Sequence, residues 1–212
     1  MIDLSDATIK RIGVYGGAFD PPHLAHRALA QAAVEQLALD CLLILPTGQA
    51  WHKDRGLTPA HHRLAMTRLA FHDLPHSKID DREIRRAGPT YTVDTLRELA
   101  QENPGAQLFL VMGADQANSL HTWHEIEEIY RLAIIGFAER DAPDLPLTQS
   151  QARLQDKDPA IQGDFRAIVL PLMPHSATDI RSRVASGQSP NALVCDAVAS
   201  YIQDNHLYPT AR

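Results

Sequence analysis

The sequence is short of cysteine, of basic charge and of long apolar runs. Its two cysteines, Cys41 and Cys195, lie far apart in apolar surroundings, and neither has a second cysteine at metal-binding or redox spacing. We therefore expect two buried thiols and no cysteine-based metal or redox site.

Basic residues are outnumbered by acidic ones. The 212 residues contain 20 Lys and Arg against 26 Asp and Glu, which gives a formal charge of −6 and a pI of about 6.0. This balance argues against a general nucleic-acid coat protein, because duplex-binding domains carry a basic stripe that supplies much of their affinity. We expect no nucleic-acid partner, and any phosphate that the protein handles must be bound locally.

No apolar run approaches the roughly 18 residues of a membrane helix, and the opening residues MIDLSDATIK lack the apolar core of a signal peptide. We therefore expect a cytoplasmic protein with no membrane partner. The composition, 44% apolar and 22% charged, is that of an ordinary globular protein, and with no linker evident we expect a single domain over 1–212.

Segments with strand and helix patterns alternate along the chain. This order favours an α/β fold in which a parallel sheet is covered on both faces, a doubly wound arrangement closed by C-terminal helices. The polar segment 141–163 contains three prolines and is interpreted as a surface insertion. We expect strands at 11–15, 41–45, 77–81, 107–112, 132–137 and 167–170, and helices at 24–39, 58–71, 93–101, 126–130, 178–186 and 191–205.

The loop after the first expected strand has the most informative sequence. Ligands of parallel sheets bind beyond the carboxyl ends of the strands, and here the chain reads GGAFDPPHLAH over 16–26. His23 and His26 share one face of a helix start, where backbone N–H groups attract anions. An alternative is a tight turn at Gly16 and Gly17, a helix cap by Asp20 and solvated histidines. The glycines do not have the G-x-G-x-x-G spacing of a dinucleotide-binding turn.

Two motifs in this order resemble a known superfamily. GGAFDPPHLAH resembles the GGTFDPxHxGH signature of the nucleotidyltransferases that share a Rossmann-like fold and an HxGH motif, and HSATDIR at 175–181 resembles their ISSTxIR segment. The two lie about 150 residues apart. This pairing is much more specific than either motif alone, and the chain is identified as similar to that superfamily.

The segments between the two motifs narrow the resemblance. PTGQAWHK at 46–53, GPTYTVDTL at 88–96, and MGAD at 112–115 with TW at 122–123 are similar to the bacterial nicotinate-nucleotide adenylyltransferases. The likeness runs from about 12 to 208. It implies transfer of AMP from ATP to nicotinate mononucleotide, which yields deamido-NAD and pyrophosphate and contributes to NAD biosynthesis.

The resemblance also implies residue roles. The attacking phosphate is largely dianionic at neutral pH, so no general base is required. The resemblance implies Mg²⁺ bound with the triphosphate, held mainly by phosphate oxygens and water and not by a protein cage. His121 and His124 have ligand-like spacing but no evident third ligand. The implied catalytic residues are His23, His26, Lys53 and Arg181; the ATP contacts are Gly16, Gly17, Ala18, Phe19, His23, His26, Gly113, Asp115, Ser176, Thr178 and Arg181; and the nicotinate mononucleotide contacts are His52, Lys53, Tyr91, Thr92 and Trp123.

Within these sets, His26 is the better candidate for stabilising the transition state, and Trp123 is expected to stack on the pyridine ring. The sequence departs from the family pattern at Ala18, Ala25, Trp51 and His175. Other readings are a pantetheine-phosphate or other nucleotidyltransferase of the same fold, a nucleotide-binding regulatory protein without turnover, and a class I aminoacyl-tRNA synthetase fragment, which no KMSKS-like segment supports. A homo-oligomer is compatible with the sequence but is not indicated by it.

Overall fold

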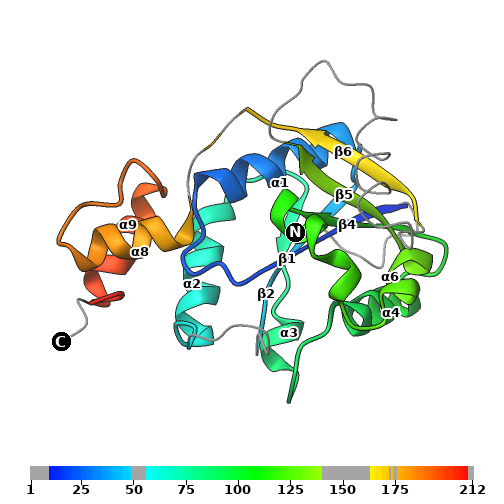
Figure 1. The fold of residues 1–212 in the computed structure, drawn as a ribbon, viewed down its shortest axis with the longest axis horizontal. Coiled ribbons are helices and arrows are strands. Elements are labelled where there is room, and N and C mark those ends of the chain that lie inside the picture. Colours follow the sequence, from blue (N-terminus) through cyan, green and yellow to red (C-terminus); the bar gives the residue numbers. More distant parts are fainter. Residues whose placement is uncertain (1–9, 49–55, 140–162, 172, 174–175, 210–212) are drawn as a thin grey trace.

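The computed structural model describes residues 10–48, 56–139, 163–171, 173 and 176–209. Within them lies one parallel sheet with the strand order β3-β2-β1-β4-β5-β6 (Figure 1). The α/β prediction is thus confirmed. The strands are β1 (Arg11–Gly17), β2 (Cys41–Pro46), β3 (Ser77–Ile79), β4 (Gln107–Met112), β5 (Ala133–Glu139) and β6 (Phe165–Val169).

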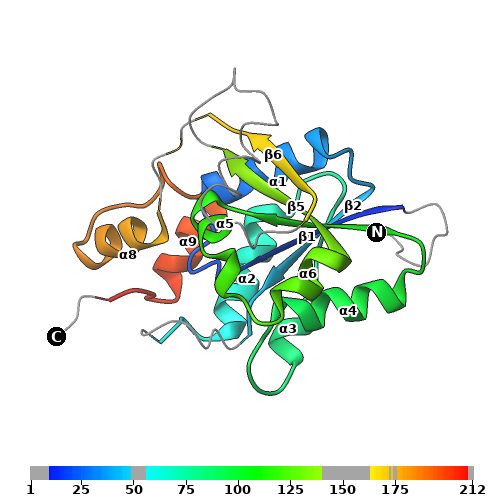
Figure 2. The ribbon, with the colours of Figure 1, turned by 45° about the vertical axis from the view of Figure 1, so that its right-hand side comes forward.

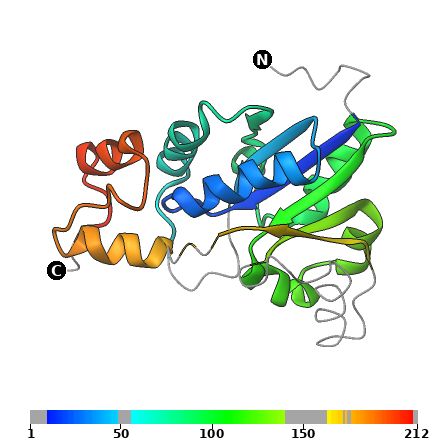
Figure 3. The same cartoon turned by 90° about the horizontal axis from the view of Figure 1, so that it is seen from above.

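Helices cover both faces of the sheet, as expected for a doubly wound fold (Figure 2). Residues of α1 (Leu24–Gln36), α2 (Ala60–Phe71), α8 (Ala177–Ala185) and α9 (Asp196–Asp204) contribute to the hydrophobic core on one face. Residues of α4 (Thr92–Glu102), α5 (Ala114–Asn118), η1 (Leu120–Thr122) and α6 (Ile126–Leu132) form the core on the other. The short α3 (Arg82–Arg85) precedes α4. The C-terminal α9 packs beside α2 (Figure 3).

The strand order places a switch point between β1 and β4. From β1 the chain moves outward through β2 and β3, then returns to the other side of β1 and continues through β4, β5 and β6. The loops that follow β1 and β4 therefore diverge to opposite faces, and in sheets of this kind the divergence leaves a crevice beyond the carboxyl ends of the two strands. This crevice is where both the sequence motifs and the topology predict a ligand site.

Strand β1 is built for burial on both faces. Ile12 and Val14 pack into the core beneath α4, whereas Tyr15 packs beneath α1. At Gly13 an added Cβ would lie 2.5 Å from Leu39 Cδ1 and 2.6 Å from Leu42 Cδ1, so glycine allows these side chains to close over the strand. A strand with two buried faces is typical of a parallel sheet.

Several boundaries differ from the sequence predictions. Helix α1 ends at Gln36 and not at 39, because Ala38 adopts a left-handed conformation (φ 47°) that turns Leu39 into the core. Helix α9 begins at Asp196 and not at 191. The short elements α3, α5 and η1 were not predicted; each has only three to five residues, too few to show a helical period.

The two cysteines differ in how deeply they are buried. Cys41 is fully buried as predicted, and burial raises its pKa to about 11. The prediction is wrong for Cys195, which is half-buried because it precedes the first turn of α9.

Segment 141–163 lies outside the described residues except for Gly163. Among the helices that are described, none combines the length and the apolar character needed to cross a membrane.

Candidate active site

The loop after β1 carries the two histidines of the first motif at the start of α1. His23 is the N-cap residue, and its backbone N–H donates a hydrogen bond to His26 Nδ1 at 3.2 Å. The two imidazoles stack with a centroid distance of 3.7 Å. His23 is buried and His26 is half-buried against the Phe19 ring, so the alternative of solvated histidines is wrong.

Asp20 does not cap the helix. Its side chain is buried, and its carboxylate accepts hydrogen bonds from the Tyr208 hydroxyl (2.8 Å) and from the Thr58 backbone N–H (3.3 Å). The carboxylate thus faces α2 and the C-terminal segment, and not the first turn of α1. The cap that the sequence allowed at this position is therefore wrong.

The other residues of this loop that were predicted to contact ATP have different surroundings. Gly16 and Gly17 end β1, and an added Cβ at Gly16 meets no atom within 4 Å. The Phe19 ring is buried in edge-on contact with Tyr15 and Phe71, so this side chain belongs to the core. The Ala18 carbonyl accepts a hydrogen bond from Arg63.

The second motif lies at the start of α8. Ser176 is its N-cap and accepts a hydrogen bond from the Asp179 N–H at 3.1 Å. Arg181, half-buried, donates to Thr178 Oγ1 at 2.9 Å and to the backbone carbonyl of Asp20 at 2.8 Å. The bond to Asp20 joins residues 161 positions apart and brings the two motifs together.

Two further predicted ATP residues follow β4. Gly113 is the N-cap of α5, and Asp115 is exposed in its first turn. Both lie at the carboxyl end of the strand that pairs with β1. Asp115 is therefore not the cap of this helix, and its side chain is exposed at that end of the sheet.

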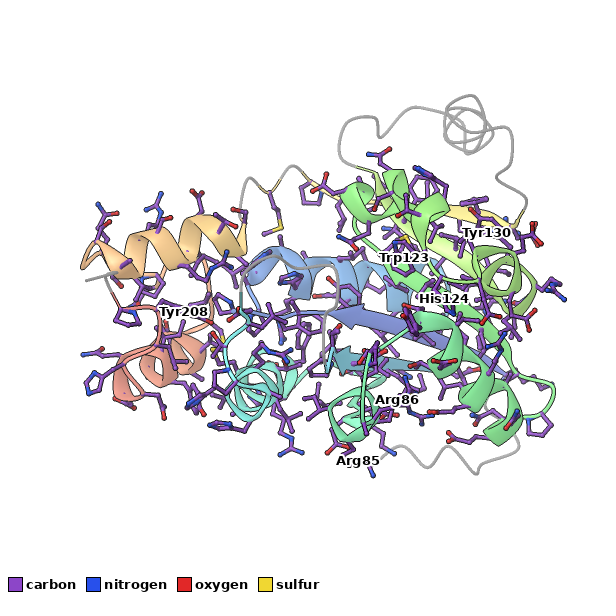
Figure 4. All side chains as sticks on the ribbon, turned by 60° about the horizontal axis from the view of Figure 1, so that its bottom comes forward. Arg85, Arg86, Trp123, His124, Tyr130 and Tyr208 are labelled. Atoms are coloured by element: carbon purple, nitrogen blue, oxygen red, sulfur yellow. The ribbon has the colours of Figure 1, made fainter. Side chains whose placement is uncertain are left out.

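Predicted pyridine contacts gather on the other face of the sheet. Tyr91 is the N-cap of α4, Thr92 is its first residue, and Trp123 is half-buried at the end of η1 (Figure 4). Tyr91 and Trp123 pack against the same core cluster. The Tyr91 ring also lies over His124, with a centroid distance of 4.3 Å.

Sequence reasoning missed His124 as an aromatic partner, because a contact between positions 91 and 124 leaves no local signal. It also missed Glu125, which adopts a left-handed conformation (φ 50°) directly after the His124 position and forms an ion pair with Arg97 of α4. This ion pair connects the segment that contains Trp123 to helix α4, which begins at Thr92.

Four residues discussed from the sequence, His52, Lys53, Trp51 and His175, lie outside the described residues. The roles of His52 and Lys53 stay predictions. The other predicted contacts come from loops after β1, β3, β4 and β6, which is the arrangement that a doubly wound sheet imposes.

Two buried charged residues were not singled out from the sequence. Arg63 and Glu83 are 1% and 5% exposed, although Arg and Glu are almost never fully buried unless paired. Glu83 accepts a hydrogen bond from the Thr95 hydroxyl at 3.0 Å, and burial raises its pKa to about 7. Composition and periodicity give no indication of either burial.

The described side chains near the stacked histidines include hydrogen-bond donors that suit phosphate oxygens. No group of three or more His, Cys, Asp or Glu side chains among the described residues is arranged to hold a metal ion. The side chains around the stacked histidines supply imidazole, guanidinium and hydroxyl groups, and the Asp20 carboxylate is engaged by Tyr208 and Thr58. This donor set suits oxyanions.

Gly48 provides a steric test of how the loop after β2 meets α3. A Cβ added there would overlap the Glu83 carbonyl oxygen and lie 3.0 Å from Thr90 Oγ1. We expect Gly48→Ala to lower the free energy of unfolding by about 1–3 kcal/mol, because backbone atoms must move to accept the methyl group. Urea unfolding measures the effect.

Gly56→Ala is the matched control, because a Cβ at Gly56 meets no atom within 4 Å. We expect its free energy of unfolding to lie within about 0.5 kcal/mol of wild type. Equal stability of the two variants would contradict the close approach of Gly48 to α3.

Comparisons with known proteins agree with this geometry. A family model described as cytidylyltransferase-like matches residues 14–183. A "Probable nicotinate-nucleotide adenylyltransferase" of Albidiferax ferrireducens is 51% identical over 203 residues, covering 96% of this chain and 100% of the relative. Another of the same description, from Methylibium petroleiphilum, is 42% identical over 207 residues, covering 96% and 94%.

A solved structure supports the fold. The Plasmodium falciparum nicotinic acid mononucleotide adenylyltransferase complexed with NaAD aligns with a TM-score of 0.76, covering 94% of this chain and 97% of that chain. The two sequences are 20% identical. At this identity the likeness shows a shared fold and no more.

Proposed function

The chain belongs to the nicotinate-nucleotide adenylyltransferase family, and as a member it transfers the AMP group of ATP to nicotinate mononucleotide; we propose that His23, His26 and Arg181 contact the reacting phosphates. The products are deamido-NAD and pyrophosphate, so the enzyme acts in NAD biosynthesis. The predictions of family, reaction and enzyme class are thus confirmed, and the residue roles below are proposals.

One observation carries the proposed site. Arg181 of α8 donates to the carbonyl of Asp20, three residues before His23, so the guanidinium lies beside the loop that leads to the stacked imidazoles. The starts of helices α1 and α8, which are far apart in the sequence, therefore converge. They bring one guanidinium and two imidazoles together in a chain whose net charge is negative. Helix N-termini, Arg and His all favour bound anions.

In the proposed reaction, an oxygen of the nicotinate mononucleotide phosphate attacks the α-phosphorus of ATP. A new P–O bond forms, the bond from the α-phosphorus to the bridging oxygen breaks, and pyrophosphate leaves with that electron pair. The attacking phosphate monoester is largely dianionic at neutral pH, since its second pKa is about 6, so no side chain need remove a proton. Catalysis then consists of positioning and charge stabilisation.

His26 is the proposed contact to the α-phosphoryl group. Because its Nδ1 accepts the hydrogen bond of the His23 N–H, the neutral ring carries its proton on Nε2, which is a donor suited to a phosphate oxygen. Charge that builds on pyrophosphate would meet the α8 N-terminus, with Ser176, Thr178 and Arg181 as donors. Lys53 and His52 are proposed to meet the mononucleotide phosphate or the triphosphate.

On the opposite face, Trp123 is the proposed stacking surface for the pyridine ring. Tyr91 and Thr92 begin α4, where backbone N–H groups lack partners within the helix and suit the ring carboxylate. Gly113 and Asp115 are proposed to meet the adenylyl group and its ribose.

Nucleotidyltransferases of this kind typically require Mg²⁺. We propose that the ion enters with the triphosphate and is held by phosphate oxygens and water, because the donor set around His23 and Arg181 suits the phosphates themselves. The ion would neutralise charge on the triphosphate, while the side chains fix the position of the phosphorus.

A paired-substrate assay tests the proposed substrate. Purified protein is incubated with Mg·ATP and either nicotinate or nicotinamide mononucleotide, and pyrophosphate release is measured. We expect turnover with the nicotinate form and much slower turnover with the amide, because the α4 N-terminus favours a carboxylate. Absence of pyrophosphate release, or a strong preference for the amide, would overturn the proposal.

A further inference from the structure

Arg63 of α2 is a buried guanidinium that touches three segments of backbone. Its Nε donates to the Thr58 carbonyl at 2.9 Å, Nη1 to the Ala18 carbonyl at 3.0 Å and Nη2 to the Gly48 carbonyl at 3.2 Å. Ala18 belongs to the loop after β1, and Gly48 to the loop after β2. One side chain thus connects the loops that follow two neighbouring strands.

The burial of this charge requires compensation. Arg63 is 1% exposed, and burial lowers its pKa, whereas the negative charge of Asp20 opposes that change. A buried cation is tolerated only when hydrogen bonds and an opposite charge replace its lost hydration. Three carbonyls and the nearby Asp20 carboxylate meet this requirement.

Asp20 extends the same cluster to the C-terminal segment. Its carboxylate accepts from the Tyr208 hydroxyl and the Thr58 N–H, and its carbonyl accepts from Arg181. Tyr208 lies at the end of the molecule formed by α8 and α9 (Figure 4). The backbone of residues 18–20, just before the stacked histidines, is therefore held by α2, α8 and the C-terminal segment together.

We propose that Arg63 is a positioning residue for adenylyl transfer. It fixes the loop after β1 against the loop after β2, and the hydrogen bond between Tyr208 and Asp20 holds the same loop after β1. This inference rests on the proposed function of His23 and His26. Arg63 touches no substrate; it acts by holding the peptide units that set the place of the two imidazoles. A displacement of about 1 Å at a reacting group can cost about 100-fold in rate.

A merely structural role predicts a different outcome. If Arg63 only stabilised the fold, its variants would unfold more readily but turn over normally while folded. A positioning role predicts that folded variants lose kcat by a larger factor than KM for nicotinate mononucleotide rises. Tyr91, Thr92 and Trp123, the proposed pyridine contacts, lie on the other face of the sheet, and only His52 and Lys53 belong to the loop after β2 that Arg63 contacts.

The test compares Arg63→Lys and Arg63→Ala with Arg68→Ala, which removes an exposed arginine from the same helix. Activity is measured well below each melting midpoint, with Mg·ATP and nicotinate mononucleotide. We expect kcat to fall at least about tenfold in both Arg63 variants, with a smaller factor of change in KM for the mononucleotide. Methylguanidinium should partly restore kcat to Arg63→Ala.

A second variant decides the matter if the Arg63 variants do not fold. Tyr208→Phe removes only the hydroxyl that donates to Asp20, and its matched control is Tyr201→Phe, whose hydroxyl pairs with His62 on the outer part of α2. We expect kcat to fall several-fold in Tyr208→Phe and to stay at the wild-type value in Tyr201→Phe.

Folded Arg63 variants, or in their absence Tyr208→Phe, with wild-type kcat would overturn the positioning role. That failure is distinct from failure of the proposed function, because the wild-type enzyme would then still release pyrophosphate from ATP and nicotinate mononucleotide. Absence of that release in wild type would instead refute the function itself.

Discussion

Replacing His26 with alanine is expected to reduce kcat by about 100- to 1,000-fold, the range found when one preorganised donor to a transition state is removed. The His26 ring is held by the His23 N–H and by contact with Phe19, so its Nε2 donor is already oriented before substrate binds. ATP affinity should change far less, because Arg181 and the α1 and α8 helix starts remain. Steady-state pyrophosphate release and calorimetric ATP binding measure the two effects.

His72→Ala is the matched control for the His26 variant. His72 follows the last turn of α2, and its side chain is 70% exposed. We expect kcat of this variant to stay within about twofold of wild type. If His26→Ala retained wild-type turnover, the imidazole would have no part in the transition state; a protein that bound ATP without any turnover would instead fit a regulatory nucleotide-binding role.

Replacing Glu83 with glutamine is expected to stabilise the protein at alkaline pH relative to wild type. Burial raises the pKa of Glu83 to about 7 against an ordinary value of 4.5, although the Thr95 hydroxyl and Arg86 act in the opposite direction. The folded state therefore favours the neutral carboxyl. Its stabilising contribution is fully present below about pH 4.5 and is lost as the pH rises through 7.

The pKa difference corresponds to about 3 kcal/mol, since one pKa unit is worth about 1.4 kcal/mol. Gln cannot ionise, so the free energy of unfolding of Glu83→Gln minus that of wild type should rise by up to that amount between pH 5 and pH 8. Urea unfolding at several pH values measures this difference. The control is Glu127→Gln, which makes the same substitution at an exposed position of α6.

A pH-independent difference for Glu83→Gln would contradict the raised pKa. The result also bears on the site, because the Thr95 hydroxyl that contacts Glu83 lies in α4, one turn beyond the proposed carboxylate-binding residues Tyr91 and Thr92. The carboxyl that ionises in this pH range therefore lies close to the proposed pyridine site.

Local patterns were sufficient for most of the fold. The segment 107–112, in which Gln107 is followed by five apolar residues, predicted β4 to the residue, because a strand buried on both faces needs a continuous apolar sequence. The spacing of His23 and His26 placed both on one face of a helix start, and the structure stacks them there. Boundaries were less accurate where a backbone conformation decides, as at Ala38, whose left-handed turn ends α1 early.

The proposed site was predictable where a motif marks it and not where long-range contacts build it. The motifs pointed to Arg181, but not to its hydrogen bond with Asp20. Asp20 itself looked like a helix cap, because Asp before a helix usually is one. It pairs instead with Tyr208, which is 188 positions away and has no local relation to it.

The sequence by itself determined the alternation of strands and helices, the negative net charge and the types of side chain offered to phosphates, because these depend on composition and on periodicity within one element. Only the tertiary structure decided that Arg63 and Glu83 are buried, that Asp20 joins α2 to α8 and the C-terminal segment, and that Tyr91 meets His124. Burial and hydrogen bonding between distant residues arise from the packing of whole elements against one another. A charge therefore acquires its partner, its pKa and its role only when the sheet brings its loops to a common edge.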